Sequence, residues 1–163
     1  MEHFVNEYRY TPELVEESVG AWWKWKSKKA LDSMLVCIVM IPLLAMFTKN
    51  IYCLMILVLP IAVLVLLKAK AKKGIQTEKD RLQVMYPNES PLLHVEIGED
   101  ISVKTEGNSR TISFSDVEDV LETPSLIVLC IAGMMTIALD KDGFVEGTAE
   151  QCLDDLRQRS GRH

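Results

Sequence analysis

The sequence predicts an α+β membrane protein, in which a two-helix transmembrane hairpin carries a cytosolic antiparallel β-sheet domain closed by a C-terminal helix. Three observations predict this class. Apolar runs occupy residues 31–47 and 51–67, lysines cluster at the outer end of each run, and apolar residues alternate from Leu92 onward. Each run spans about 26 Å as a helix, which approaches the thickness of a thin hydrocarbon core.

Residues 1–29 are expected to form an N-terminal strand and an interfacial amphipathic helix. Alternation from Phe4 to Tyr10 predicts the strand, and Thr11-Pro12-Glu13 predicts the helix start by combining an N-cap, an N1 proline and an acid in the first turn. Tryptophans between lysines are typical of a membrane interface. A lipid or ligand cage formed by the rings is the alternative. The predicted anchors here are Trp22, Trp23, Lys24, Trp25, Lys26, Lys28 and Lys29.

Residues 30–67 are the predicted hairpin, and residues 68–91 are a predicted basic helical linker. The linker adds the remaining predicted anchors, which are Lys68, Lys70, Lys72 and Lys73. Lysines on both outer ends predict that both termini are cytoplasmic in an inner-membrane protein, with residues 48–50 outside. Pro42 and Pro60 predict kinks. Asp32 is expected to pair with Lys28 or Lys29 one turn away rather than to relay protons.

Residues 92–163 are the predicted soluble domain. Period-two patterns predict strands at 92–97, 101–105, 112–114, 117–121 and 135–139, and the run at 126–132 is apolar on both faces and therefore predicted to be central. Thr148-Ala149-Glu150-Gln151 reads as a capping box that opens the last helix, with Cys152, Leu153 and Leu156 on its buried side.

Charge is divided unevenly along the chain, whose net charge is −5. Residues 1–81 carry 12 Lys/Arg and 8 Asp/Glu, whereas residues 82–163 carry 6 and 15. The lysines predict an anionic cytoplasmic leaflet as one partner. The acidity of the second half argues against a nucleic-acid partner, because such binding needs a positive surface, and leaves an unidentified protein as its expected partner.

The order of these parts resembles the YcxB-like family of small two-pass bacterial membrane proteins. The resemblance rests on Glu99-Asp100-Ile101, the stretches 112–117 and 120–123, and the stretch 137–144 before the last helix. The family aromatic near Ser115 and the proline at Asp140 are missing. The resemblance implies a fold like that of pleckstrin-homology domains for the C-terminal part, and it implies no catalytic residues.

No catalytic, cofactor or metal residues are predicted. The three histidines lie far apart, and His94 is expected to be a solvated strand residue. Cys37, Cys53, Cys130 and Cys152 form no C-x-x-C motif, and residues 138–149 fail the EF-hand pattern. The sequence therefore predicts a membrane-anchored, non-enzymatic protein that displays an interaction domain. The alternatives are an oligomerising pore or transport subunit, a stress-protection or immunity protein, and an enzyme using Asp32 or His94.

Overall fold

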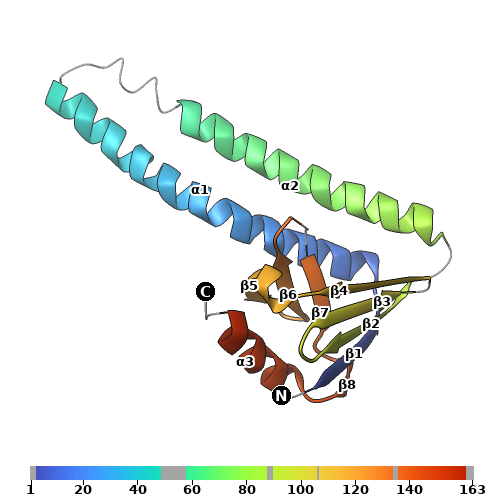
Figure 1. Ribbon diagram of the computed structural model, residues 1–163. Coiled ribbons are helices and arrows are strands. Elements are labelled where there is room, and N and C mark those ends of the chain that lie inside the picture. The colour runs from blue at the N-terminus through green and yellow to red at the C-terminus, as the bar shows by residue number, and fades with distance from the viewer. Residues whose placement is uncertain (1–2, 49–57, 88–89, 106, 134–135, 161–163) are drawn as a thin grey trace. The chain divides into compact units, whose positions relative to one another are not determined.

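The computed structural model describes residues 3–48, 58–87, 90–105, 107–133 and 136–160 (Figure 1). The chain divides into two compact units. Unit 1 comprises residues 1–22 and 77–163, and unit 2 comprises residues 23–76. Segments from both ends of the chain therefore build unit 1.

Five strands form the first antiparallel sheet of unit 1, in the order β4-β3-β2-β1-β8. Their bounds are β1 (Phe4–Arg9), β2 (Leu92–Ile97), β3 (Ile101–Thr105), β4 (Asn108–Ile112) and β8 (Phe144–Glu146). Strand β1 pairs with β2 in an unbroken register from Phe4↔Ile97 to Arg9↔Leu92. The strands predicted at the N-terminus, at 92–97 and at 101–105 are confirmed.

Three strands form the second antiparallel sheet, in the order β5-β6-β7. They are β5 (Val117–Glu122), β6 (Leu126–Ile131) and β7 (Thr136–Asp140). Every residue of β6 is buried, and the strand is central, as its apolar sequence predicted. Phe114 was expected in a strand, but it begins the 3-10 turn η2 (Phe114–Asp116), because the Ser113 side chain accepts a hydrogen bond from the Ser115 N–H and caps that turn.

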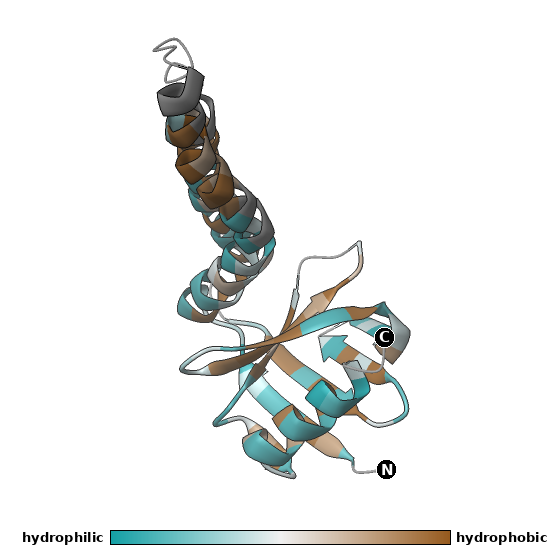
Figure 2. Cartoon of the chain, turned by 90° about the vertical axis from the view of Figure 1, so that its left-hand side faces the viewer, coloured by the Kyte–Doolittle hydropathy of each residue, from teal (hydrophilic) through white to brown (hydrophobic). Residues whose placement is uncertain are grey.

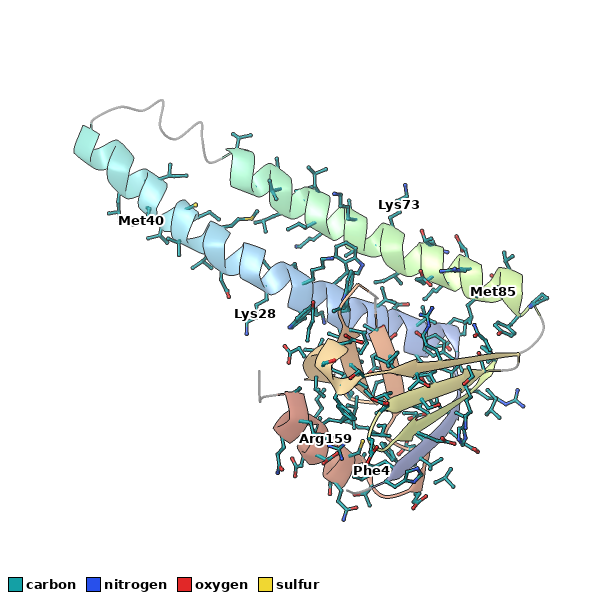
Figure 3. The ribbon with its side chains drawn as sticks, viewed as in Figure 1. Phe4, Lys28, Met40, Lys73, Met85 and Arg159 are labelled. Atoms are coloured by element: carbon teal, nitrogen blue, oxygen red, sulfur yellow. The ribbon has the colours of Figure 1, made fainter. Side chains whose placement is uncertain are left out.

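The two sheets and the C-terminal helix α3 (Ala149–Ser160) enclose the larger of two hydrophobic clusters, and the smaller consists of Leu126, Val128 and Ala138. The Gln151 N–H donates to Thr148 Oγ1 at 3.3 Å, which confirms the predicted cap. Cys152, Leu153 and Leu156 are buried, as predicted. The Arg159 guanidinium lies 4.7 Å above the Phe114 ring and donates to the Gly98 carbonyl, which holds the end of α3 against the first sheet (Figure 3).

Side chains of β1 also contact the edge of β7 and so join the two sheets. Asn6 is fully buried, and its Nδ2 donates to the Asp140 carbonyl at 2.7 Å. Its Oδ1 accepts from the Asp140 N–H at 3.1 Å. The Tyr8 hydroxyl donates to the Ala138 carbonyl at 2.7 Å. The Asp140 carbonyl also accepts from the Gly143 N–H at 3.1 Å, so the side chains of β1 add to the hydrogen bonds of the backbone at the edge of β7.

Two long helices run through both units, α1 (Pro12–Thr48) and α2 (Val58–Met85). The predicted helix start at Thr11 is confirmed, because Val15 N donates to the Thr11 carbonyl at 3.0 Å and Leu14 N to Thr11 Oγ1 at 3.5 Å. Within unit 2, the Trp23 ring lies against Gly74. A Cβ at Gly74 would sit 2.8 Å from Trp23 Nε1, so only glycine allows this approach.

The predicted transmembrane hairpin is not supported. Within the part of the chain that the structure describes, no helix is long and apolar enough to cross a membrane. Residues 49–57, which hold the predicted external loop and the start of the second run, lie outside the described residues.

This finding corrects three predictions made from the sequence. The membrane fold class, the multi-pass membrane assignment, and the inner-membrane location with cytoplasmic termini all depended on two spanning helices. The described residues instead form an α+β fold with two antiparallel sheets rather than one.

Candidate functional site

A groove of about 360 Å³ in unit 1 is the candidate site. It lies where the first turns of α1 and the last turns of α2 meet the ends of four strands. The apolar part of its lining is Val15 and Val19 of α1, Leu82 and Met85 of α2, Leu93 of β2, and Pro91. The polar part is Tyr10, Glu78, Arg81, Tyr86, Thr105, Asn108 and Thr136.

Helical periodicity places these side chains on common faces. Val15 and Val19 are four residues apart and are both 2% exposed. Glu78, Leu82 and Tyr86 repeat the same spacing at the end of α2. An ion pair between Lys79 and Glu16 connects the two helices, and the Tyr10 N–H donates to the Pro91 carbonyl at 2.9 Å. The groove walls are therefore held together by contacts between segments far apart in the sequence.

Tyr10 and Glu78 both line the groove, and the charge of Glu78 affects the pKa of Tyr10. The Tyr10 hydroxyl lies 3.0 Å from Ser18 Oγ. Burial raises the pKa of Tyr10, and the nearby Glu78 carboxylate raises it further against the lowering effect of the Ser18 hydrogen bond. Tyr10 is therefore a neutral hydroxyl at neutral pH. Glu78 Oε1 lies 4.0 Å from Arg81 Nη1, but the Glu78 side chain is 31% exposed and the Arg81 side chain 67%.

The two units carry opposite net charges. Unit 1 contains 22 Asp/Glu and 9 Lys/Arg, a net of −13, whereas unit 2 contains 9 Lys and the single acid Asp32, a net of +8. Such a field attracts cations toward unit 1 and repels anions. Arg81 is the more exposed and solvent-screened member of its pair, so the half-buried Glu78 contributes more to the potential inside the groove.

A second polar cluster lies on the outer face of the first sheet, where the predicted solvated histidine is in fact paired. His94 Nδ1 lies 2.6 Å from Glu7 Oε1, and Nε2 lies 2.7 Å from Glu96 Oε1. Lys104 Nζ donates to the same Glu96 oxygen at 2.8 Å. Hydrogen bonds from Lys104 and His94 lower the pKa of Glu96 to about 2. Hydrogen bonds to Glu96 and Glu7 raise the pKa of His94. Because both ring nitrogens face carboxylates, the imidazolium donates twice and has no free basic nitrogen.

The predicted interface residues lie along the two helices and do not line the groove. Lys24, Lys26 and Lys28 of α1 are exposed, as are the four predicted anchors of α2, and the three tryptophans are half-buried. Lys28 and Lys73 extend away from their helices (Figure 3). The Lys29 and Pro60 side chains lie outside the described ones, Pro42 lies within α1, and Asp32 is exposed. Their predicted anchor, kink and pairing roles stay predictions.

Two of the three described cysteines, Cys130 and Cys152, are buried, and Cys37 is exposed. Burial raises the pKa of Cys130 and of Cys152 to about 12, so both thiols stay protonated at neutral pH. Among the described residues, no three His, Cys, Asp or Glu side chains are grouped so that they could hold a metal ion. The groove was not predicted from the sequence. The four-residue spacing of Glu78, Leu82 and Tyr86 near the end of the predicted linker is the sequence pattern that could have indicated it.

No family model, curated protein or solved structure matches this chain. The resemblance to the YcxB-like family therefore gains no support from these comparisons and stays a prediction.

Proposed function

We propose that this protein is a non-enzymatic interaction protein whose acidic unit 1 binds a basic, partly apolar peptide segment of a partner protein in the groove. One observation carries the proposal. The groove combines apolar walls from α1, α2 and β2 with the half-buried side chain of Glu78, in a unit with a net charge of −13.

The size and composition of the groove suit side-chain recognition. Ligand sites usually measure about 300–1,000 Å³ and combine apolar walls with a few orienting polar groups. At about 360 Å³, this groove accommodates one or two side chains. Val15, Val19 and Leu82 supply apolar surface, and Glu78 with the neutral Tyr10 hydroxyl supplies orientation.

A cationic group is the favoured polar feature of the ligand. A positive group gains from Glu78 and from the field of the whole unit, whereas a carboxylate has only the exposed Arg81 and must overcome the net negative charge. The rings of Tyr10 and Tyr86 line the same groove and offer faces for a cation.

The position of β4 favours a peptide as the ligand. Among the described strands, β4 is an edge of its sheet, and Asn108 at its start lines the groove. Residues 108–111 are exposed. A peptide segment leaving the groove can therefore extend along β4 and form main-chain hydrogen bonds, which is a common mode of peptide recognition.

The His94 cluster supports a binding protein better than an enzyme using His94. A general base needs a nitrogen that can accept a proton from a substrate. Both nitrogens of His94 already donate to Glu7 and Glu96 on an open sheet face, so this cluster stabilises the sheet rather than providing a base.

Titration calorimetry with three matched peptides tests the proposal on the full chain. Acetyl-Leu-Lys-Leu-Lys-amide has both features, acetyl-Leu-Glu-Leu-Glu-amide reverses the charge, and acetyl-Gly-Lys-Gly-Lys-amide removes the apolar side chains. We expect the first to bind at least about tenfold more tightly than either of the others. Equal affinity for all three peptides, or preference for the glutamate peptide, would overturn the proposal.

Two pairs of variants locate the binding site. Glu78→Gln should weaken the Leu-Lys peptide by about fivefold, whereas Glu99→Gln, which removes an exposed acid in the β2–β3 turn, should have little effect. Leu82→Ala should weaken binding by about tenfold, whereas Val84→Ala, two residues away and 81% exposed, should not. Equal effects within each pair would show that the peptide binds elsewhere.

A further inference from the structure

We propose that the partner peptide binds as an added antiparallel strand along β4, and that its C-terminal continuation enters the groove. This inference rests on the proposed function, because it specifies how the peptide that occupies the groove is held outside it. It predicts the direction in which the peptide runs and the alternation of its side chains. Three features of β4 carry it, namely the direction of its backbone polar groups, the position of the groove at its first residue, and the charge around it.

The backbone polar groups of β4 point alternately toward β3 and toward the open side of the strand. Thr105 pairs with Asn108 with only two residues between them, and Gly107 has φ +83°, so this pair closes the β3–β4 hairpin and exchanges hydrogen bonds. Because hydrogen-bonded and non-hydrogen-bonded pairs alternate, Ser109 and Thr111 direct their N–H and carbonyl groups away from β3. Among the described strands, β4 is an edge of its sheet, and its first four residues are exposed. These groups can therefore pair with an added strand.

The groove lies at the first residue of β4, so a strand paired with β4 continues into it. Thr105 and Asn108 are partners in the register, and both line the groove. Among the residues of β4, only Asn108 lines it. Directly opposite residues of a sheet have their side chains on the same face, so the peptide residue beside Asn108 has its side chain on the groove side.

The direction of β4 determines which end of the peptide enters the groove. The strand begins at the groove with Asn108 and ends at Ile112, which is buried and does not line the groove. An antiparallel peptide therefore runs from Ile112 toward Asn108 and enters the groove with its C-terminal part. The described strand pairs of this sheet are all antiparallel, and antiparallel pairing is slightly more stable per residue than parallel pairing.

Charge favours a basic peptide over a second copy of β4 as the added strand. If two copies paired Ser109 with Thr111 in both directions, Arg110 of one copy would lie opposite Arg110 of the other. Like charges directly opposite each other destabilise a sheet, and two copies of unit 1, each with a net charge of −13, repel each other. A basic peptide is attracted to unit 1 and can place an uncharged residue opposite Arg110.

The two faces of the added strand meet different neighbours. Peptide residues opposite Ser109 and Thr111 lie beside hydroxyl groups, on the face of the sheet that also presents Lys104. Residues opposite Arg110 and Asn108 lie on the other face, where the partner of Arg110 is Val103. Figure 2 shows hydrophilic and hydrophobic bands on the strands of unit 1. A segment that alternates threonine and valine fits both faces, because Thr–Thr and Thr–Ser pairs across strands are favourable.

Titration calorimetry of the full chain with two extended peptides of equal composition tests the proposal. Acetyl-Thr-Val-Thr-Val-Leu-Lys-Leu-Lys-amide has the strand-forming segment before the groove-binding segment, and acetyl-Leu-Lys-Leu-Lys-Thr-Val-Thr-Val-amide has it after. We expect the first to bind at least about tenfold more tightly than acetyl-Leu-Lys-Leu-Lys-amide, because it adds main-chain hydrogen bonds to β4. The second should gain less than about threefold, because its extension leaves the groove in the wrong direction for antiparallel pairing.

Methylation of single peptide nitrogens detects the added strand without changing the protein. In the first peptide, the N–H of the third residue points toward β4 opposite Ser109, and the N–H of the second residue points away. Methylation at the third residue should therefore remove the tenfold gain, whereas methylation at the second should change the affinity by less than about twofold.

A pair of variants at one position tests the same contact from the side of the protein. Thr111→Pro removes an N–H that points away from β3, which an edge strand tolerates, and should remove the gain while leaving the affinity for the unextended peptide unchanged. Thr111→Val keeps the N–H and is the matched control, which should bind the extended peptide like the wild type. Circular dichroism shows whether each variant is folded.

The outcomes distinguish this inference from the proposed function. If the unextended peptide binds but the first extension adds nothing, or if methylation at the third residue is tolerated as well as at the second, the strand inference is overturned and the groove proposal stands. Tighter binding of the second extended peptide would show parallel pairing and would also overturn the inference. A dimer of the free chain in sedimentation velocity that Thr111→Pro dissociates would identify a second copy as the added strand. If the unextended peptide does not bind, both proposals are wrong.

Discussion

Replacing Asn6 with alanine removes the side chain that ties β1 to the edge of β7. The Asn6 amide is fully buried and makes one donated and one accepted hydrogen bond with the backbone of Asp140. These bonds link the five-stranded sheet to the three-stranded sheet, because β1 and β7 belong to different sheets. The substitution therefore tests whether this contact stabilises the arrangement of the two sheets.

The expected loss follows from the Asp140 N–H, because the Asp140 carbonyl keeps the hydrogen bond that it accepts from the Gly143 N–H at 3.1 Å. A buried donor or acceptor without a partner costs about 1–3 kcal/mol. Asn6→Ala should therefore lower the free energy of unfolding by about 1–3 kcal/mol. Against a typical domain stability of about 5–15 kcal/mol, this is a large fraction.

Urea unfolding followed by circular dichroism measures the loss, and hydrogen exchange at the Asp140 amide locates it. Gln158→Ala is the control, because Gln158 is an exposed amide on α3 and its loss should change stability by no more than about 0.5 kcal/mol. If Asn6→Ala costs less than about 1 kcal/mol and Asp140 stays as protected as in the wild type, our account of the junction is wrong.

Three further predictions concern other parts of the chain. Hydrogen bonds to Glu96 and Glu7 raise the pKa of His94 in the folded protein. The protonated imidazole therefore stabilises the fold fully below the unfolded-state pKa of about 6.5, and this contribution is lost as the pH rises through the higher folded-state pKa. His94→Gln should thus lower the free energy of unfolding by up to about 1 kcal/mol near pH 5.5 and hardly at all near pH 9; an equal loss at both would contradict this. Gly147→Ala should cost about 2–4 kcal/mol by thermal unfolding, because Gly147 has φ +80° and a Cβ would overlap the buried Phe4 ring. In Gly20→Ala, where the helix leaves open space, stability should rise slightly. Cys130 and Cys152 should react with a thiol reagent only after unfolding, whereas the exposed Cys37 should react at once; fast labelling of all three in the native protein would refute the burial of the first two.

Local elements were predictable where the sequence pattern alone determines them. Alternation identified β1, β2 and β3, and the cap residues Thr11 and Thr148 marked two helix starts. Strand β8 was missed because three residues are too few to form a pattern, and two of them are exposed. Phe114 was misplaced because a side-chain cap at Ser113 competes with strand pairing.

Long-range organisation was not predictable from local pattern. The pairing of Phe4 with Ile97 brings the N-terminus into a sheet with strands far along the chain, and the contact of Asn6 with Asp140 spans 134 residues. The groove has the same origin, since Val15, Leu82 and Leu93 come from three separated segments. The acidic character of its unit was visible in the composition, but the position of Glu78 within a groove depends on how α2 docks.

Chemical-shift mapping on the full, isotope-labelled chain tests the central claim most directly. On titration with acetyl-Leu-Lys-Leu-Lys-amide, our account predicts shifts at Val15, Val19, Leu82, Leu93 and Asn108, which line the groove. It predicts unchanged resonances at Ser102, Lys104 and the other residues around the His94 cluster, on the outer face of the sheet. Shifts confined to that outer face, with the groove residues unmoved, would contradict the claim that unit 1 binds its partner in the groove.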